Sequence, residues 1–272
     1  KNDEGLQKAG DVVAYQQFAL REAKGADLSL SENETKALKA VKLTDKKKEP
    51  LLTLQAQNFT LAFDRATGFI TRYEVGGNSL LGEGGSLKPN FWRAVTDNDM
   101  GANLQNRLKV WREPKMTLTT LNVEKIKESK GTAATVTAVY DMPEVKATLT
   151  LTYKVNGDGE MEVTQAMTKS TPEAKAADLL RFGMVMDLPY GMDKSLWYGR
   201  GPIENYSDRN HCTDLGLYRQ SVDEQFYSYI RPQETGTKTD IRWWKQLNDA
   251  GRGLQIVADA PFSASALHYT IE

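Results

Sequence analysis

The chain has 272 residues, with 35 Lys and Arg against 36 Asp and Glu, and a net charge of −1. This balance gives no electrostatic attraction for nucleic acid or an anionic membrane surface, so neither is expected as a partner. The apolar runs are too short to span a membrane, and the single cysteine, Cys212, excludes an internal disulfide. What remains is a globular protein long enough to bury a sizeable core.

The first fifty residues fall into two parts. Residues 11–20 predict a strand with Val13, Tyr15 and Phe18 as its buried positions. Residues 22–50 are polar and charged, which predicts a solvated linker. Because the chain begins on a polar run without Met and stops within an alternating stretch at Glu272, we expect an excised piece of a longer protein.

From Leu51 onward the pattern predicts one strand after another. Two alternating segments flank a turn at Gly68, which is typical of a hairpin. A short helical pattern is confined to residues 103–108. The sequence therefore predicts an all-β, antiparallel sandwich. Further strands are expected at residues 134–140, 146–155, 160–168, 179–188, 195–198, 253–258 and 264–271.

Three polar, aromatic-containing segments interrupt the strands, at residues 88–101, 198–209 and 231–244. Such loops often carry function. Glycoside hydrolysis needs two carboxyl groups facing each other across the bond, but Asp and Glu in loops more often bind backbone N–H groups or pair with Arg. The two histidines, His211 and His268, do not have the spacing of metal ligands. We therefore predict no catalytic and no metal-binding residue.

Sugar recognition is the remaining chemistry, because aromatic rings stack on sugar faces while charged groups bind hydroxyls. Trp197 lies in an apolar strand and is predicted to fill the core, whereas one ring of Trp243-Trp244 is expected to point inward and the other outward. The carbohydrate-binding candidates are Arg200, Glu204, Arg231, Glu234 and Trp243.

Five ordered motifs resemble one known family. They are Asp64-Arg65-x-x-Gly68-Phe69, Phe91-Trp92-Arg93-Ala94-x-x-Asp97-Asn98-Asp99-x-Gly101, Gly199-x-Gly201-Pro202-x-Glu204-Asn205-Tyr206-x-Asp208-Arg209, Tyr229-Ile230-Arg231-Pro232-Gln233-Glu234-x-Gly236 with Asp240-x-Arg242-Trp243, and Gly10-Asp11-Val12-Val13-Ala14-Tyr15-Gln16-Gln17-Phe18. Together they are similar to the C-terminal small-chain domain of bacterial β-galactosidases in glycoside hydrolase family two. The resemblance implies a large antiparallel β-supersandwich, like that of galactose mutarotases, truncated here at its C-terminus. It also implies that residues 1–21 are the remnant of the last strand of an immunoglobulin-like domain, 22–50 a linker and 51–272 an incomplete supersandwich.

In this family the catalytic glutamates and the Mg and Na sites lie in a barrel outside the present chain, so the resemblance implies no cofactor in the chain itself. It implies a non-catalytic fragment that supports the architecture and active-site rim of an enzyme hydrolysing terminal β-D-galactosides. The expected partners are the rest of the parent chain and a galactoside, and oligomerisation stays open, as does the choice between cytoplasm and periplasm. A carbohydrate-binding module and a mutarotase-type epimerase are the alternatives.

Without its own sandwich, the strand predicted at residues 11–20 is expected to expose its apolar side chains and unpaired backbone groups.

Overall fold

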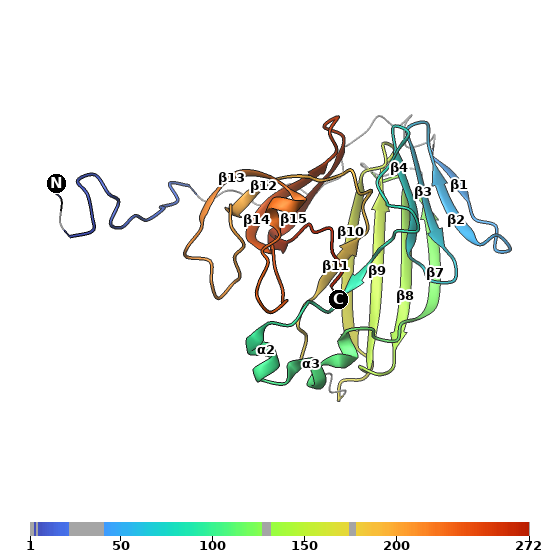
Figure 1. Cartoon of the computed structure of the whole chain (residues 1–272). Coiled ribbons are helices and arrows are strands. Elements are labelled where there is room, and N and C mark those ends of the chain that lie inside the picture. Colours follow the sequence, from blue (N-terminus) through green and yellow to red (C-terminus); the bar gives the residue numbers. More distant parts are fainter. Residues whose placement is uncertain (1–2, 4, 22–40, 127–131, 174–177, 272) are drawn as a thin grey trace.

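A computed structural model describes residue 3 and residues 5–21, 41–126, 132–173 and 178–271. These residues form antiparallel strands with a few short helices, which confirms the predicted all-β class (Figure 1). The helical pieces are α2 (Asp97–Gly101), α3 (Leu104–Arg107), a 3-10 turn (Lys109–Trp111) and α4 (Val222–Gln225). In the described ranges, no helix has both the length and the apolar character to cross a membrane.

The first sheet has the strand order β1-β2-β3-β4-β6-β11, and β5 pairs with β4. The predicted hairpin is confirmed as β3 and β4, whose turn contains Gly68 at φ +74°. A Cβ at Gly68 would lie 2.5 Å from the hydroxyl of Tyr140, so packing as well as φ requires glycine there. The strands are β1 (Lys42–Thr44), β2 (Leu51–Gln55), β3 (Phe59–Asp64), β4 (Ile70–Val75), β5 (Asn78–Ser79), β6 (Leu87–Asn90) and β11 (Gly183–Met186).

The second sheet packs against the first and closes the main core. Its order is β10-β9-β8-β7, formed by β7 (Thr117–Lys125), β8 (Ala134–Met142), β9 (Ala147–Val155) and β10 (Met161–Lys169). Side chains on β8 and β9 alternate between buried and half-buried, as the period of two requires. Across the core, Phe63 packs edge-on against Tyr153 with ring centroids 5.1 Å apart. Each large apolar side chain buried here stabilises the fold by roughly 1.5–3 kcal/mol.

The third sheet stands beside the other two, at the red end of the chain (Figure 1). Its order is β13-β12-β14-β15, from β12 (Lys194–Gly201), β13 (Asp214–Ser221), β14 (Lys238–Leu247) and β15 (Gly253–Ala264). It has a small core of its own, consisting of Trp197, Ile241 and Trp244. Trp197 is confirmed as a core residue, and Trp244 is the inward ring of the Trp243-Trp244 pair.

The strand predicted at residues 11–20 is wrong, because this segment has no strand pairing. Val13, Tyr15 and Phe18 are 76%, 67% and 74% exposed instead of buried. A strand needs neighbours for its backbone groups, and the segment runs outward from the sheets (Figure 1). The expectation that its apolar side chains are exposed is confirmed.

Other predicted boundaries also change, and the strand predicted at residues 179–188 is confined to β11. Residues 22–40 of the predicted linker lie outside the described residues, but the assignment of residues 41–50 to a linker is wrong in part, since Val41 is buried and β1 pairs with β2. The separate strand predicted at residues 264–271 is wrong as well, because β15 runs unbroken to Ala264 and the following residues are irregular. Ala266 packs against the core of the third sheet, and Tyr269 packs on Phe226 with ring centroids 4.7 Å apart.

Candidate functional site at the junction of three polar loops

The three polar segments of the sequence meet in space, and we call their meeting point the loop junction. The backbone N–H of Asp97 donates to the side-chain oxygen of Gln233 at 3.2 Å. The backbone N–H of Asn205 donates to the carbonyl of Thr237 at 2.8 Å. The third segment therefore touches both of the others, and the first of these contacts joins residues 136 positions apart in sequence.

The first segment is fixed by a capped helix. Thr96 caps α2, and the carboxylate of Asp99 returns a hydrogen bond to the Thr96 backbone N–H at 2.8 Å. Arg93 donates two further hydrogen bonds to Asp99, at 2.5 and 3.2 Å. Burial raises the pKa of Asp99, but the donors from Arg93 and Thr96 outweigh burial and lower the pKa below its ordinary value. The segment is thus held by an internal ion pair.

Glu204 lies at the centre of the loop junction, just beyond the end of β12. Its carboxylate accepts four kinds of donor: the backbone N–H of Gly236 at 2.9 Å, the Thr235 hydroxyl at 3.2 Å, the Arg209 guanidinium at 2.8 Å, and the Tyr229 hydroxyl. Burial by itself would raise the pKa of Glu204. The hydrogen bonds outweigh burial, so the net result is a pKa below the ordinary value. Glu204 is therefore a charged clamp between the second and third segments.

Glu234 is the second carboxylate of the junction. Arg181 donates to it at 2.6 Å and the Thr237 hydroxyl at 3.0 Å, and its side chain is 8% exposed. The oxygens of both carboxylates accept hydrogen bonds from protein donors. A cation site needs carboxylate oxygens that are free to coordinate the ion. In the described part of the chain, no group of three or more His, Cys, Asp or Glu residues is placed to hold a metal ion.

The remaining sugar-binding candidates are not gathered in one place. Arg200 donates to Asp240 at 2.6 Å and to two backbone carbonyls of the following loop. Arg231 is exposed at the edge of the junction, 3.3 Å from the Asp97 carboxylate. Trp243 is half-buried on β14, where the Lys245 ammonium lies 5.5 Å from its ring. The structure thus brings Glu204 and Glu234 together, with Arg231 at their margin, and the sugar-binding role of all five residues stays a prediction.

Sequence reasoning missed two buried polar residues at the junction. Asn205 is fully buried, and its side-chain oxygen accepts from both the backbone N–H and the hydroxyl of Thr239. Lys238 is 1% exposed, and its ammonium donates to the Gly236 carbonyl at 3.0 Å above the ring of Trp197. Asn205 stands in one of the ordered motifs, but nothing in the sequence indicated that it is buried, and Lys238 had no signal, since Asn and Lys in polar loops are ordinarily exposed.

Lys238 should make stability depend on pH. Burial lowers its pKa to about 8, and the nearby Glu204 charge offsets only part of that effect. Because the unfolded chain binds this proton more tightly, the folded state is penalised by up to about 3 kcal/mol below pH 8, and the penalty disappears as pH rises past the unfolded pKa. We expect Lys238→Met to raise the free energy of unfolding near pH 7 by about 1–2 kcal/mol. This gain is smaller than the penalty it removes, because Met cannot make the hydrogen bond to the Gly236 carbonyl. Urea unfolding near pH 7 and near pH 9.5 checks this: the difference between variant and wild type should shrink at the higher pH, and a constant difference would contradict it.

The histidines bear on the epimerase alternative. His211 is exposed in a turn. His268 lies 3.0 Å from the Asp223 carboxylate and stacks on Tyr190 at 4.2 Å, while its other ring nitrogen is enclosed without a hydrogen-bond partner. A histidine that acts as an acid must present a ring nitrogen to the sugar. In His268, Nδ1 is paired with Asp223 and Nε2 is buried, so neither nitrogen faces a ligand. This geometry does not favour epimerisation.

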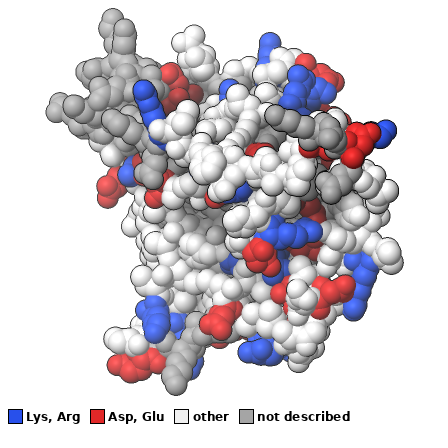
Figure 2. Space-filling model, turned by 90° about the vertical axis from the view of Figure 1, so that its left-hand side faces the viewer, with Lys and Arg blue, Asp and Glu red and all other residues white. Residues whose placement is uncertain are grey.

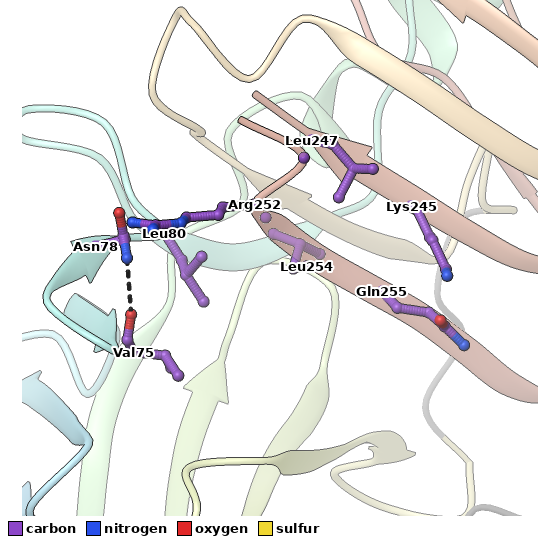
Figure 3. Close-up of a pocket in the computed structure, with 10 residues that line it drawn as sticks. Val75, Asn78, Leu80, Lys245, Leu247, Arg252, Leu254 and Gln255 are labelled. Carbon is purple, nitrogen blue, oxygen red and sulfur yellow. Dashed lines mark hydrogen bonds between the residues drawn. The ribbon is translucent and has the colours of Figure 1, made fainter. Parts of the chain in front are cut away.

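The charged surface and a cleft away from the junction offer no second set of the sugar-binding candidates. On the face shown in Figure 2, basic and acidic side chains are interspersed, and no patch of one sign dominates the described residues. A cleft of about 380 Å³ lies between the β4–β5 turn and the β14–β15 hairpin, and it is lined by Asn78 and Leu80 on one side and by Arg252 and Leu254 on the other (Figure 3). None of the five sugar-binding candidates lines this cleft.

Residues 55–272 match the family described as "Beta galactosidase small chain". The β-galactosidase of Priestia megaterium is 36% identical over 269 residues, which cover 98% of this chain and 25% of the relative. Those of Lactobacillus delbrueckii subsp. bulgaricus and Kluyveromyces lactis are 33% and 27% identical, over 80% and 97% of this chain and 21% and 25% of the relatives. The chain therefore spans about a quarter of the length of the curated relatives it matches. It belongs to the β-galactosidase small-chain family.

Proposed function

We propose that the chain is a non-catalytic part of a β-galactosidase that hydrolyses terminal β-D-galactosides, where it supports the architecture of the enzyme and the rim of its active site. The family supports the parent activity, because the matched relatives are β-galactosidases of which the chain spans about a quarter. The catalytic carboxylates and the Mg and Na sites are proposed to lie in the rest of that enzyme.

The supporting role is inferred from the hydrogen-bond partners and the charge of the two junction carboxylates, Glu204 and Glu234. A glycosidase needs one carboxyl group protonated as the acid and another free to attack or to activate water. Glu204 and Glu234 are instead each bound by an arginine and by hydroxyl donors, and the Glu204 pKa is held low. Glu204 ties the second segment to the third, and Glu234 ties the third segment to Arg181, so both groups stiffen the surface. This suits a rim better than a reaction centre.

A chimera tests the proposal. The quarter of the Priestia megaterium β-galactosidase that matches this chain is replaced by residues 3–271, and hydrolysis of a chromogenic β-galactoside is measured. We expect the chimera to be active, while the relative lacking that quarter and the present chain alone are both inactive. Turnover by the pure chain would overturn the non-catalytic role. A folded but inactive chimera would overturn the supporting role.

A further inference from the structure

The cleft between the β4–β5 turn and the β14–β15 hairpin carries positive charge. Lys245 and Arg252 line it together with the amides of Asn78 and Gln255, and none of the described residues that line it is acidic. Neither Lys245 nor Arg252 forms an ion pair with a described carboxylate. A cleft lined by charges of one sign concentrates ligands of the opposite sign, so this cleft favours an anion.

The size and the walls of the cleft suit a small ring. Its volume is about 380 Å³, and ligand sites in proteins typically combine a volume of about 300–1,000 Å³ with apolar walls and a few polar groups. In Figure 3, Arg252 reaches from the hairpin toward Asn78 on the opposite side of the cleft. The apolar walls are formed by Val75, Leu80, Leu247 and Leu254.

The polar groups of the cleft can bind hydroxyl groups as well as an anion. Asn78 uses its side-chain NH2 for the carbonyls of Val75 and Gly76, at 3.5 and 3.0 Å, which leaves its side-chain oxygen to accept from a hydroxyl. The Lys245 ammonium lies 5.5 Å from the Trp243 ring and has no hydrogen bond to a described residue, so its three donors are available. A sugar that carries a carboxylate offers both kinds of group.

Two aromatic rings continue the site beyond the cleft. Trp243 and Tyr198 are directly opposite on β14 and β12, so they share a face of the third sheet. Lys245 is on the same face, because it follows Trp243 by two residues on one strand. The Arg242 guanidinium lies 5.8 Å from the Tyr198 ring and has no carboxylate partner among the described residues. The face next to the cleft therefore repeats the combination of an aromatic ring and an unpaired cation.

We propose that the cleft and this aromatic face bind an acidic polysaccharide, with a uronate unit in the cleft and the adjoining sugar rings against Trp243 and Tyr198. Carboxylates gain charge-assisted hydrogen bonds from the unpaired cations, which a neutral glycan does not. Single-stranded nucleic acid also stacks on aromatic rings, but its phosphates have no hydroxyl to donate to Asn78. This binding goes beyond the supporting role in a β-galactosidase and does not depend on it.

Calorimetry of the chain with polygalacturonate tests the site. Lys245→Glu and Arg252→Glu should each weaken binding by about tenfold or more, because each removes a charge-assisted hydrogen bond. Trp243→Ala should weaken binding by about threefold to tenfold, the effect of losing one stacked ring. Lys169→Glu is the matched control, since Lys169 is exposed on β10 and the net charge changes equally; its affinity should stay within about twofold of wild type.

The opposing outcomes are specific. Wild type that does not bind polygalacturonate would overturn the site, and so would equal weakening by Lys169→Glu, which would show attraction to net charge alone. Neutral galactan should bind at least about tenfold more weakly than polygalacturonate, and equal binding would overturn the acidic class of ligand. Tighter binding of oligothymidylate would assign the face to nucleic acid instead. Arg252 is exposed beside the hairpin turn, so Arg252→Glu decides the result even where Trp243→Ala disturbs folding.

Discussion

Trp197→Ala is expected to lower the free energy of unfolding by roughly 3–5 kcal/mol. Trp197 is fully buried and stacks on Trp244 with ring centroids 5.2 Å apart and planes 16° apart. Its indole N–H also donates to the Arg200 carbonyl at 3.0 Å, and its ring lies under the Lys238 ammonium. Truncation leaves a cavity, an unpaired carbonyl and a buried ammonium that has lost its aromatic neighbour, and these effects act in the same direction.

Denaturant unfolding followed by near-ultraviolet circular dichroism measures this loss, because the stacked Trp197–Trp244 pair should give a signal that disappears in the variant. The third sheet has a core separate from that of the main sandwich. We therefore expect amide exchange to accelerate in β12 and β14 more than in β8 and β9. Trp243→Ala is the control on the same strand, and since Trp243 is half-buried its cost should be about 1 kcal/mol. Equal losses in the two variants would contradict the assignment of Trp197 as the centre of this core.

Glu204→Ala is expected to cost about 2–3 kcal/mol, because it leaves the Gly236 N–H and the Thr235 hydroxyl without their acceptor, whereas the half-exposed Arg209 can be hydrated. Glu204→Gln keeps one acceptor oxygen and the size of the side chain, so a smaller loss of about 1–2 kcal/mol is expected. Asp208→Ala is the control in the same loop, where the carboxylate is exposed, and should stay within about 0.5 kcal/mol.

The pH dependence separates a charged clamp from simple packing at Glu204. Its folded pKa is lowered, so its contribution is present above the unfolded pKa and is lost as pH falls through the folded pKa. The stability difference between wild type and Glu204→Gln should therefore be constant near neutral pH and should shrink in acid, below about pH 4.5. Urea unfolding over this range measures the difference, and a difference that does not change in acid would argue against the charge.

Much of the fold could be read from local patterns, since alternation and turn residues are local properties. The β3–β4 hairpin with Gly68 and the inward Trp197 are examples. The candidate site was harder to predict, because the sequence marked the three polar segments but contained no signal that they meet. Their joining depends on single atoms, such as the Gly236 N–H that donates to Glu204, and a pattern of residue types does not encode such pairings.

The errors have one physical cause, which is that a strand also requires a neighbour. Residues 11–20 have the alternation of a strand but no paired strand among the described residues, so they stay outside the sheets except where the Gln17 side chain bonds Leu215 of β13. Residues 264–271 alternate too, yet beyond Ala264 they are irregular, with Ala266 against the core of the third sheet and Tyr269 against Phe226. Conversely, the polar surroundings of residues 42–44 predict a linker, and pairing with β2 makes these residues a strand.

The sequence by itself determined the all-β class, the absence of a strong net charge and, through its ordered motifs, the family. These follow from composition, from the period of two and from residue types at fixed spacing. The tertiary structure alone decided that Glu204 and Glu234 are clamps, that Lys238 is buried beneath a polar loop, and that Gln17 pairs with the edge of β13. Each of these depends on contacts between residues far apart in the chain, and such contacts exist only once the sheets have packed.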